Sequence, residues 1–410
     1  MERNTIVCGD ALEVMRGWPD GCVQMCVTSP PYWGLRDYGV DGQLGLESTP
    51  ELYVEHLVEI MREVRRVLRD DGTLWLNLGD SYAGSMKGIG ADGSYYGGEK
   101  QRTNAGSVGI TPYKPDWSCV NLKPKDLVGI PWRVAFALQA DGWWLRSDII
   151  WSKPNPMPES VRDRPTKAHE YVFLLSKSKR YYYDADAVRE PIAASTANDT
   201  RLWKEGYTTD RPERGYPGGA SHGSGMLQPS PTGRNRRTVW TIATKPFSGA
   251  HFAVFPPDLI EPCILAGTSA RGCCPECGAG WERVVERTSK GKSYAVGKSD
   301  DKRGKGLATA FSGYDDGSSC PTFTTTGWQP TCDCFSDDPA QTAWDVQMGL
   351  EEYDPVRCIV LDPFMGAGTT ALVALEHNRG YVGIELNPDY IEIAERRLAQ
   401  VTGVQLPLIT

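Results

Sequence analysis

A glycine-rich turn near the C-terminus has the residue types that bind a nucleoside cofactor. The run 357–362 predicts a strand, and a helix is predicted over 369–377, after Gly366 and Gly368. Because glycine has no Cβ, the backbone of such a turn can approach a ligand closely. The candidate cofactor-binding residues of this turn are Asp362, Pro363, Phe364, Gly366, Gly368, Thr369 and Thr370.

A second strand, predicted at 381–385, supplies an acidic residue to the same site. It ends in Glu385, and Asn387 follows as a further candidate. An acidic residue in this place of a strand–turn–helix–strand unit is suited to binding ribose hydroxyls. The turn has neither the G-x-G-x-x-G pattern of dinucleotide sites nor the Gly-Lys-Ser/Thr of ATP sites, so a different nucleoside cofactor is expected.

The segment Ser29-Pro30-Pro31-Tyr32 could act on a base. It directly follows a strand predicted at 23–28. Its prolines fix φ and make a rigid turn at the carboxyl end of that strand, where open α/β sheets bind ligands. The exocyclic amine of cytosine or adenine is a poor nucleophile, because its lone pair is delocalised into the ring. A hydroxyl and a backbone carbonyl that accept hydrogen bonds from the amine would draw it towards tetrahedral geometry, and Tyr32 could stack on a flipped base.

Both turns resemble motifs of the DNA amino-methyltransferases, which use S-adenosylmethionine. The turn at 362–370 is similar to their cofactor motif, Glu385 matches their ribose-binding acid, and 29–32 is similar to their catalytic motif, Asp/Asn/Ser-Pro-Pro-Tyr/Phe. The catalytic motif comes first in the chain, as in the permuted β class. Residues 33–39 and 151–155 further resemble bacteriophage and prophage members of this group.

The resemblance implies further site residues and a substrate. Asp10 and Ala11 match the motif that contacts the cofactor adenine, and Phe255 lies in a segment that matches the motif lining the methionine end. The implied reaction is methyl transfer from S-adenosylmethionine to double-stranded DNA. In the related enzymes Ser at position 29 goes mostly with cytosine, so N4 of cytosine is the expected target and N6 of adenine the alternative.

Two functions of other classes stay open as alternatives. One is a DNA-binding protein with an inactive enzyme core, which the intact Ser29, Gly366, Gly368 and Glu385 argue against. The other is methylation of glutamine in a protein. That family has Asn where this chain has Ser29, and it lacks a long basic insertion.

Two cysteine pairs predict a structural zinc site. The predicted ligands are Cys274, Cys277, Cys332 and Cys334. Four thiolates can close a tetrahedral zinc site. Cys273 and Cys320 could substitute as ligands, and a set of unliganded thiols near a flexible loop is the alternative.

Two further groups of residues have types that can serve catalysis, and each has a structural explanation as well. Cys263 follows a proline, as a nucleophilic cysteine can, but it lies in a helix predicted after Pro257, where a buried thiol is the ordinary explanation. Amino methylation also needs no covalent intermediate. His169 and Glu170 begin a predicted strand and could line the base pocket or serve the structure alone.

Charge is unevenly distributed along this chain of formal net charge −8. Residues 151–250 carry 16 Lys and Arg against 10 Asp and Glu, whereas the remainder carries 28 against 42. A basic segment on an acidic body suits local contact with phosphate, although a solvated loop region would have the same composition. The region 180–245 is the candidate reader of DNA. Its candidate contacts are Arg234, Arg236 and Arg237.

The elements around these motifs predict an α/β fold, a doubly wound, mostly parallel sheet of the class I methyltransferase type. Further strands are expected at 73–78, 144–151 and 171–176, and further helices at 50–68, 125–140 and 388–400. Long loops are expected at 84–121, 190–237 and 286–327. Both motif turns follow strand ends in one sheet, so they should face one crevice whatever their order in the chain.

The expected organisation has five parts around one catalytic core. They are a catalytic half at 1–180, a target-recognition segment at 181–245, a core helix lining the cofactor site at 246–270, a zinc-ribbon-like insertion at 271–340 and a cofactor-binding half at 341–410. The composition, 40% hydrophobic and 23% charged, fits a soluble globular protein. Without an apolar signal segment or a run of about 18 apolar residues, a cytoplasmic location is expected. The oligomeric state is open, a dimer included.

Overall fold

The computed structural model of this chain divides into two units. The first comprises 1–188, 237–282 and 328–410, and the second 189–236 and 283–327. The structure describes residues 1–35, 38–83, 122–191, 233–245, 254–288, 322–334 and 354–402. The loop predicted at 84–121 and most of those at 190–237 and 286–327 lie outside the described residues.

An eight-stranded sheet forms the centre of the first unit, in the order β1-β10-β9-β2-β3-β5-β4-β6. Its strands are β1 (Thr5–Cys8), β2 (Val23–Thr28), β3 (Leu68–Leu78), β4 (Trp144–Ser152), β5 (His169–Ser176), β6 (Val239–Thr241), β9 (Ile359–Asp362) and β10 (Gly380–Glu385). β5 runs antiparallel to β3 and β4, and the remaining pairs are parallel. The expected mostly parallel α/β fold is confirmed.

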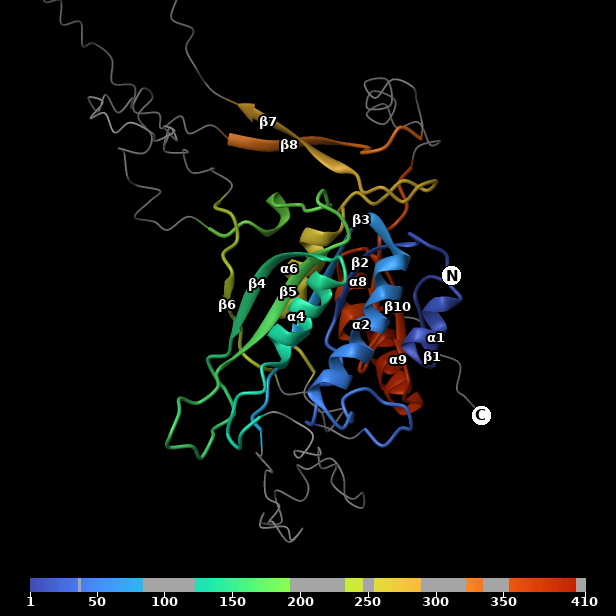
Figure 1. Ribbon diagram of the computed structural model, residues 1–410. Coiled ribbons are helices and arrows are strands. Elements are labelled where there is room, and N and C mark those ends of the chain that lie inside the picture. The colour runs from blue at the N-terminus through green and yellow to red at the C-terminus, as the bar shows by residue number, and fades with distance from the viewer. Residues whose placement is uncertain are drawn as a thin grey trace, which may run out of the picture. The chain divides into compact units, whose positions relative to one another are not determined.

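Helices cover both faces of this sheet (Figure 1). One face carries α1 (Ala11–Arg16), α2 (Pro50–Val67) and α4 (Ile130–Ala140), and the other carries α6 (Pro257–Gly267), α8 (Thr369–Glu376) and α9 (Pro388–Thr402). A short 3₁₀ turn, η2 (Asp186–Val188), contacts α6. Successive residues of a strand point to opposite faces, so Cys26 lies in the core under α2 while Met25 lies in the core under α6.

The start of α2 is confirmed as the sequence predicts. Thr49 caps the helix by accepting a hydrogen bond from the Leu52 amide over 3.2 Å, and Pro50 takes the first position. The predicted end of this helix, at 68, is nearly correct, whereas the strand predicted to start at 73 begins earlier. The helix ends at Val67 and β3 begins at once, because Leu68 already pairs with Val23 of β2.

The predicted start of α4 at Lys125 is also wrong. Lys125 and Gly129 have φ angles of 76° and 77°, which a helix cannot include. The helix begins at Ile130, where Asp80 accepts hydrogen bonds from the amides of Gly129 and Ile130 over 3.0 and 3.1 Å. An acceptor at the end of β3 therefore sets where this helix begins.

The remaining described strands, β7 (Glu282–Thr288) and β8 (Thr322–Gln329), pair with each other in a two-stranded sheet. In the second unit Glu190 also forms an antiparallel bridge with Arg234. Among the described residues, no helix combines the length and the apolar character that crossing a membrane requires.

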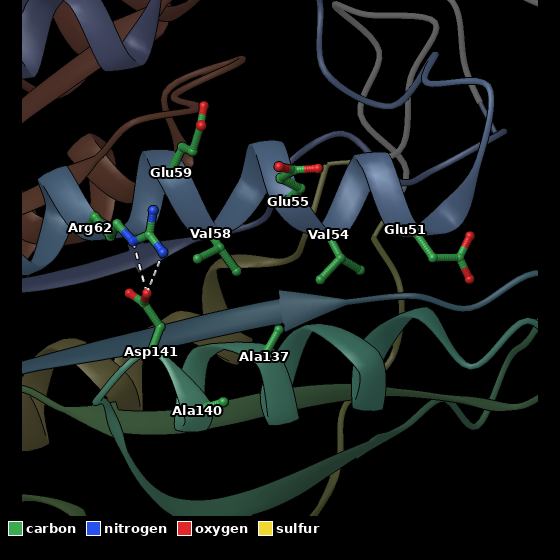
Figure 2. Close-up of a pocket in the computed structure, with 9 residues that line it drawn as sticks. All are labelled: Glu51, Val54, Glu55, Val58, Glu59, Arg62, Ala137, Ala140 and Asp141. Atoms are coloured by element: carbon green, nitrogen blue, oxygen red, sulfur yellow. Dashed lines mark hydrogen bonds and ion pairs between the residues drawn. The ribbon is translucent and has the colours of Figure 1, made fainter.

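A surface groove of about 470 Å³ lies between α2 and α4 (Figure 2). Its lining residues are Glu51, Val54, Glu55, Val58, Glu59, Arg62, Ala137, Ala140 and Asp141. Arg62 is paired with Asp141 at 2.6 Å, so the remaining charges are those of glutamates. An acidic groove does not suit a phosphate backbone, and neither motif turn contributes to its lining.

Candidate active site

The two motif turns lie side by side, at the carboxyl ends of two neighbouring parallel strands. β2 and β9 are parallel neighbours, with Cys26 opposite Leu361, so both strands end at the same edge. The turn at 29–32 follows β2 and the glycine-rich turn follows β9. The Thr28 hydroxyl donates to Asp362 Oδ1 over 2.6 Å, and both residues are fully buried. The expectation that both turns share one edge is therefore met by direct contact.

Asp362 braces the glycine-rich turn from inside. Its Oδ1 also accepts from the Phe364 amide over 3.0 Å, and its Oδ2 accepts from the Thr370 hydroxyl over 2.6 Å. Burial raises the pKa of this carboxyl from 3.8 to about 6, although the hydrogen bonds from Thr28 and Thr370 act in the opposite direction. Both oxygens thus have protein donors, and the turn has a fixed shape.

The two glycines of this turn serve different purposes. Both have positive φ angles, 51° at Gly366 and 76° at Gly368. A Cβ on Gly368 would lie 2.8 Å from the Ala394 Cβ, so this glycine lets α9 pack closely on the turn. At Gly366, the nearest described atom to such a Cβ is the Phe364 carbonyl oxygen, at 4.0 Å. The backbone at Gly366 is therefore the part that a ligand can approach.

Glu385 stands at the end of β10, beside this open backbone. Its Oε2 accepts from the Gly366 amide over 2.8 Å and its Oε1 from the Asn387 amide over 2.9 Å. Burial raises the pKa of the carboxyl, and the backbone hydrogen bonds lower it. Each carboxylate oxygen keeps a further lone pair, so the group can also accept from ribose hydroxyls.

The other predicted cofactor residues lie near this edge or on the core behind it. β1 pairs with β10, with Cys8 opposite Glu385, so Asp10 follows the strand end next to that of Glu385. Asp10 caps α1, whose first residue is Ala11, by accepting from the Glu13 amide over 3.0 Å. Phe255 precedes α6 and packs, partly buried, against the core on that face. The strand ends thus bring acidic residues from two parts of the chain to one site.

Contacts with α2 and with the segment that precedes it hold the catalytic turn rigid. The buried Tyr53 of α2 donates its hydroxyl hydrogen to the Pro31 carbonyl over 2.9 Å. The Trp33 indole, which is also buried, donates to the Glu47 carbonyl over 2.9 Å. Pro30 is buried between the half-buried Ser29 and Pro31. The turn is therefore fixed by its neighbours as well as by its prolines.

Tyr32 belongs to a polar network that sequence reasoning largely missed. Its hydroxyl accepts from Ser29 Oγ over 3.3 Å and lies 2.8 Å from Glu170 Oε2 and 3.1 Å from Asn77 Oδ1. Lys153 forms an ion pair with the other oxygen of Glu170. The sequence indicates Glu170 for the base pocket or for a structural role, whereas no motif marks Asn77 or Lys153.

Gly79 makes room for the Tyr32 ring. A Cβ at this position would lie 2.5 Å from Tyr32 Cε2 and 2.8 Å from Cδ2. The ring therefore packs directly on the backbone after β3. No sequence motif marks this contact, because it depends on how β2 and β3 lie together.

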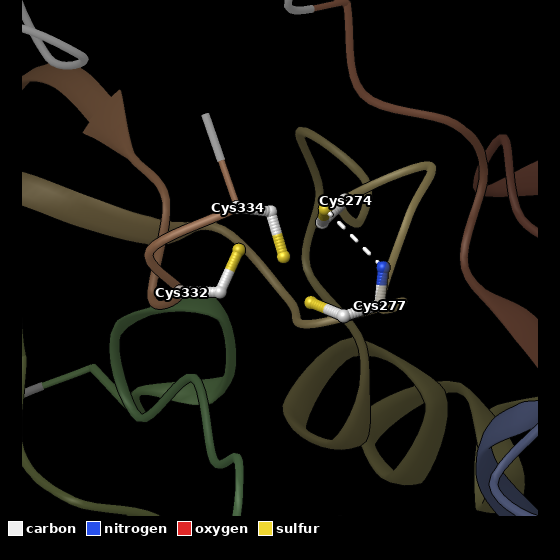
Figure 3. Close-up of side chains that lie close together, drawn as sticks. All are labelled: Cys274, Cys277, Cys332 and Cys334. Atoms are coloured by element: carbon white, nitrogen blue, oxygen red, sulfur yellow. Dashed lines mark hydrogen bonds between the residues drawn. The ribbon is translucent and has the colours of Figure 1, made fainter. Parts of the chain in front are cut away.

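The four predicted zinc ligands come together (Figure 3). The sulfurs of Cys274, Cys277, Cys332 and Cys334 all lie within 4.8 Å of one another. Tetrahedral zinc with bonds of about 2.3 Å would place its sulfurs about 3.8 Å apart, so the four thiols fit this metal after small movements. Gly278, with φ 72°, closes the turn that carries Cys274 and Cys277. Its amide donates to the Cys274 carbonyl over 2.8 Å.

Two other described cysteines, Cys273 and Cys263, lie outside this cluster. Cys273 is buried beside it and pairs its backbone with Val356, while Cys320 lies outside the described residues. Cys263 is fully buried in α6, with its sulfur 3.5 Å from the Leu259 carbonyl oxygen. This is the buried helical thiol that the sequence indicates.

The three candidate arginines are divided between the two units. Arg234, in the second unit, forms an ion pair with Glu190 at 3.1 Å. Arg236 is half-buried in the same unit, whereas Arg237 is exposed in the first. The Trp240 indole donates to the Arg237 carbonyl over 2.7 Å, which fixes the backbone there.

A family model and several relatives with similar sequences match most of this chain. The model of a DNA methylase family, N6_N4_Mtase, matches residues 23–274 and 348–396. The Type II methyltransferase M.Cfr9I of Citrobacter freundii is 39% identical over 394 residues, 96% of this chain and 87% of that protein. M.SmaI of Serratia marcescens, also a Type II methyltransferase, is 36% identical over 393 residues, 96% of this chain and 90% of its own. The solved PvuII DNA methyltransferase, cytosine-N4-specific, aligns with a TM-score of 0.48 and 14% identity, over 100% of this chain and 89% of that chain.

Proposed function

This chain belongs to the N6/N4 DNA methylase family and is an S-adenosylmethionine-dependent DNA methyltransferase, and we propose that its target is N4 of cytosine. Ser29 and its surroundings carry the proposal. A neutral hydroxyl accepts a hydrogen bond from an amine in less space than a carboxylate needs. A purine could also enter a site with Ser29 if Tyr32 shifted, and the contacts of Tyr32 with Glu170 and Gly79 oppose that shift.

The residues at the strand ends fit the cofactor. We propose that Glu385 binds its ribose, Asp10 and Ala11 its adenine, and Phe255 its methionine end. The open backbone at Gly366 allows close approach. When bound, S-adenosylmethionine supplies an electrophilic methyl group. The remaining candidates, Asp362, Pro363, Phe364, Gly368, Thr369, Thr370 and Asn387, shape the turn and the strand ends around it.

The catalytic turn prepares the amine for attack. Ser29 Oγ accepts one hydrogen of the amine, and the Pro30 carbonyl is the proposed acceptor of the other, since the Pro31 carbonyl already accepts from Tyr53. Two acceptors draw the amine towards tetrahedral geometry, so that its lone pair points at the methyl donor. The Tyr32 ring would stack on the flipped cytosine.

Replacement of Ser29 separates this function from cofactor binding. Ser29→Ala should lower the rate of labelled methyl transfer to DNA by about tenfold or more, as for a lost hydrogen bond in a transition state. The affinity for S-adenosylmethionine, measured by calorimetry, should stay within about threefold. Ser147→Ala, at a half-buried position of β4, is the control. An unchanged rate for Ser29→Ala would remove the basis of the proposed role.

Two further assignments accompany the proposed function. Cys274, Cys277, Cys332 and Cys334 would hold one structural zinc ion, as their mutual spacing supports. Residues 181–245, with Arg234, Arg236 and Arg237, would contact DNA. The relatives named above are Type II methyltransferases, and we infer that this chain likewise serves restriction–modification.

A further inference from the structure

We propose that Glu170 is a positioning residue of the catalytic turn. It accepts the hydrogen of the Tyr32 hydroxyl, so that the Ser29 oxygen stays an acceptor for the amine of the target base. This inference rests on the proposed function. It concerns a strand residue outside both motif turns.

The position of the Glu170 carboxylate is determined from two sides. In the antiparallel pair of β4 and β5, Trp151 lies opposite Glu170, and Lys153 follows directly after β4. The Lys153 ammonium pairs with Glu170 Oε1 and lies 4.2 Å from the centre of the Trp151 ring. Both side chains of the ion pair are only 17% exposed. Lysine thus compensates the charge and occupies one oxygen, while Oε2 faces Tyr32.

The network leaves one arrangement of hydroxyl hydrogens. Tyr32 has a single hydrogen to donate, and the carboxylate oxygen at 2.8 Å is its strongest acceptor. Burial and the charge of Glu170 hold the pKa of the Tyr32 hydroxyl well above its usual value, so the hydrogen stays on Tyr32. The Tyr32 oxygen then accepts from Ser29, 3.3 Å away. Since Ser29 donates inward, its lone pairs remain for the base.

Asn77 supports the same direction of hydrogen bonding. This buried amide donates from Nδ2 to the Tyr171 carbonyl over 3.0 Å, which turns its Oδ1 towards Tyr32 at 3.1 Å. An oxygen cannot donate, so Asn77 does not compete with Ser29 for the Tyr32 oxygen. Glu170 and Asn77 both present acceptors to Tyr32, and Ser29 is its donor.

The Tyr32 hydroxyl therefore has a task separate from stacking. The family motif that this turn resembles admits Phe at this position, so the ring alone suffices to contact a base. Here the ring is already placed by its packing on Gly79. What the hydroxyl adds is the link between Ser29 and Glu170.

A double-mutant cycle on the full-length protein tests this link. Tyr32→Phe removes the hydroxyl and keeps the ring, and Glu170→Gln removes the charge and keeps the shape. Each should lower the single-turnover rate of methyl transfer to DNA by about tenfold or more, with the Michaelis constant for S-adenosylmethionine within about threefold. The double variant should be no more than about threefold slower than the slower single variant, because both changes break the same chain of hydrogen bonds.

Glu63→Gln is the matched control. Glu63 is 20% exposed and pairs with Arg66 at 2.7 Å within α2. Its replacement by glutamine therefore removes a carboxylate from a comparable ion pair that does not involve Tyr32. Its rate should stay near that of the wild type. Rate losses that multiply in the double variant would show that Glu170 acts independently of Tyr32 and would overturn the proposal. A wild-type rate for Tyr32→Phe would overturn it even if the Glu170 variant failed to fold. Absence of methyl transfer by the wild type would instead refute the proposed function, and this inference with it.

Discussion

The Thr28 hydroxyl donates to Asp362 Oδ1 over 2.6 Å, although 334 positions separate the two residues in the chain. Thr28 ends β2, directly before the catalytic turn, and Asp362 ends β9, directly before the cofactor turn. This buried contact fixes the spacing of the two turns from within the core. It explains why the permuted order of the motifs leaves the site intact, since the contact depends on which strands are neighbours.

The first prediction concerns the pH dependence of stability due to Asp362. Its pKa is raised from 3.8 to about 6, so the folded state holds the proton more tightly than the unfolded state. The resulting stabilisation is present below about pH 4 and is lost as pH rises through about 6. Asp362→Asn cannot ionise. The free energy of unfolding of the wild type minus that of the variant should therefore fall by about 2.4 kcal/mol from pH 4 to pH 7. Urea denaturation at both pH values measures this, and a constant difference would disprove it.

The second prediction concerns Glu385. Glu385→Ala should weaken the binding of S-adenosylmethionine by about 1.5–3 kcal/mol, since charge-assisted hydrogen bonds to the ribose are lost. Isothermal titration calorimetry on the purified protein gives this value. Glu392→Ala, which removes an exposed carboxylate that pairs with Arg396 on α9, should bind like the wild type. Equal affinities of the two variants would assign Glu385 to bracing the turn alone.

The third prediction concerns the metal content. Protein purified without chelator should contain about one zinc per chain, and its removal should lower the melting temperature because bound metal stabilises the folded state. Cys274→Ala and Cys332→Ala, one from each pair, should each lose the metal. Cys22→Ala, a partly exposed cysteine outside the cluster, should retain it. Metal-free wild-type protein would count against the site.

The fourth prediction concerns the arginines at 234, 236 and 237. Replacing all three by glutamine should weaken DNA binding and reduce the slope of log K against log salt by up to about 2.7, because each phosphate contact contributes about 0.9. Arg16, Arg62 and Arg396, exposed arginines in ion pairs elsewhere, provide the matched triple control. Titration of a fluorescent duplex at several salt concentrations measures both slopes. Identical slopes would identify the cluster as solvated surface.

The sequence predicts those parts of the fold and site that depend on neighbouring residues. The turns at 29–32 and 362–370 are recognisable because proline, glycine and an ending strand lie together. The start of α4 was not predictable, because it depends on Asp80, 49 positions before Gly129. The Glu170–Tyr32 contact likewise joins residues 138 positions apart. Such contacts follow from the order of strands in the sheet, which local patterns do not contain.

Nucleoside mass spectrometry tests the central claim most directly. DNA from cells that express the wild-type chain is digested to nucleosides and compared with DNA from cells that express Ser29→Ala. We predict N4-methylcytosine in the wild-type sample and its strong reduction with Ser29→Ala. Detection of N6-methyladenine alone would contradict the target atom while leaving the reaction class intact. Wild-type DNA without either methylated nucleoside would contradict the claim that this chain methylates an exocyclic amine of DNA.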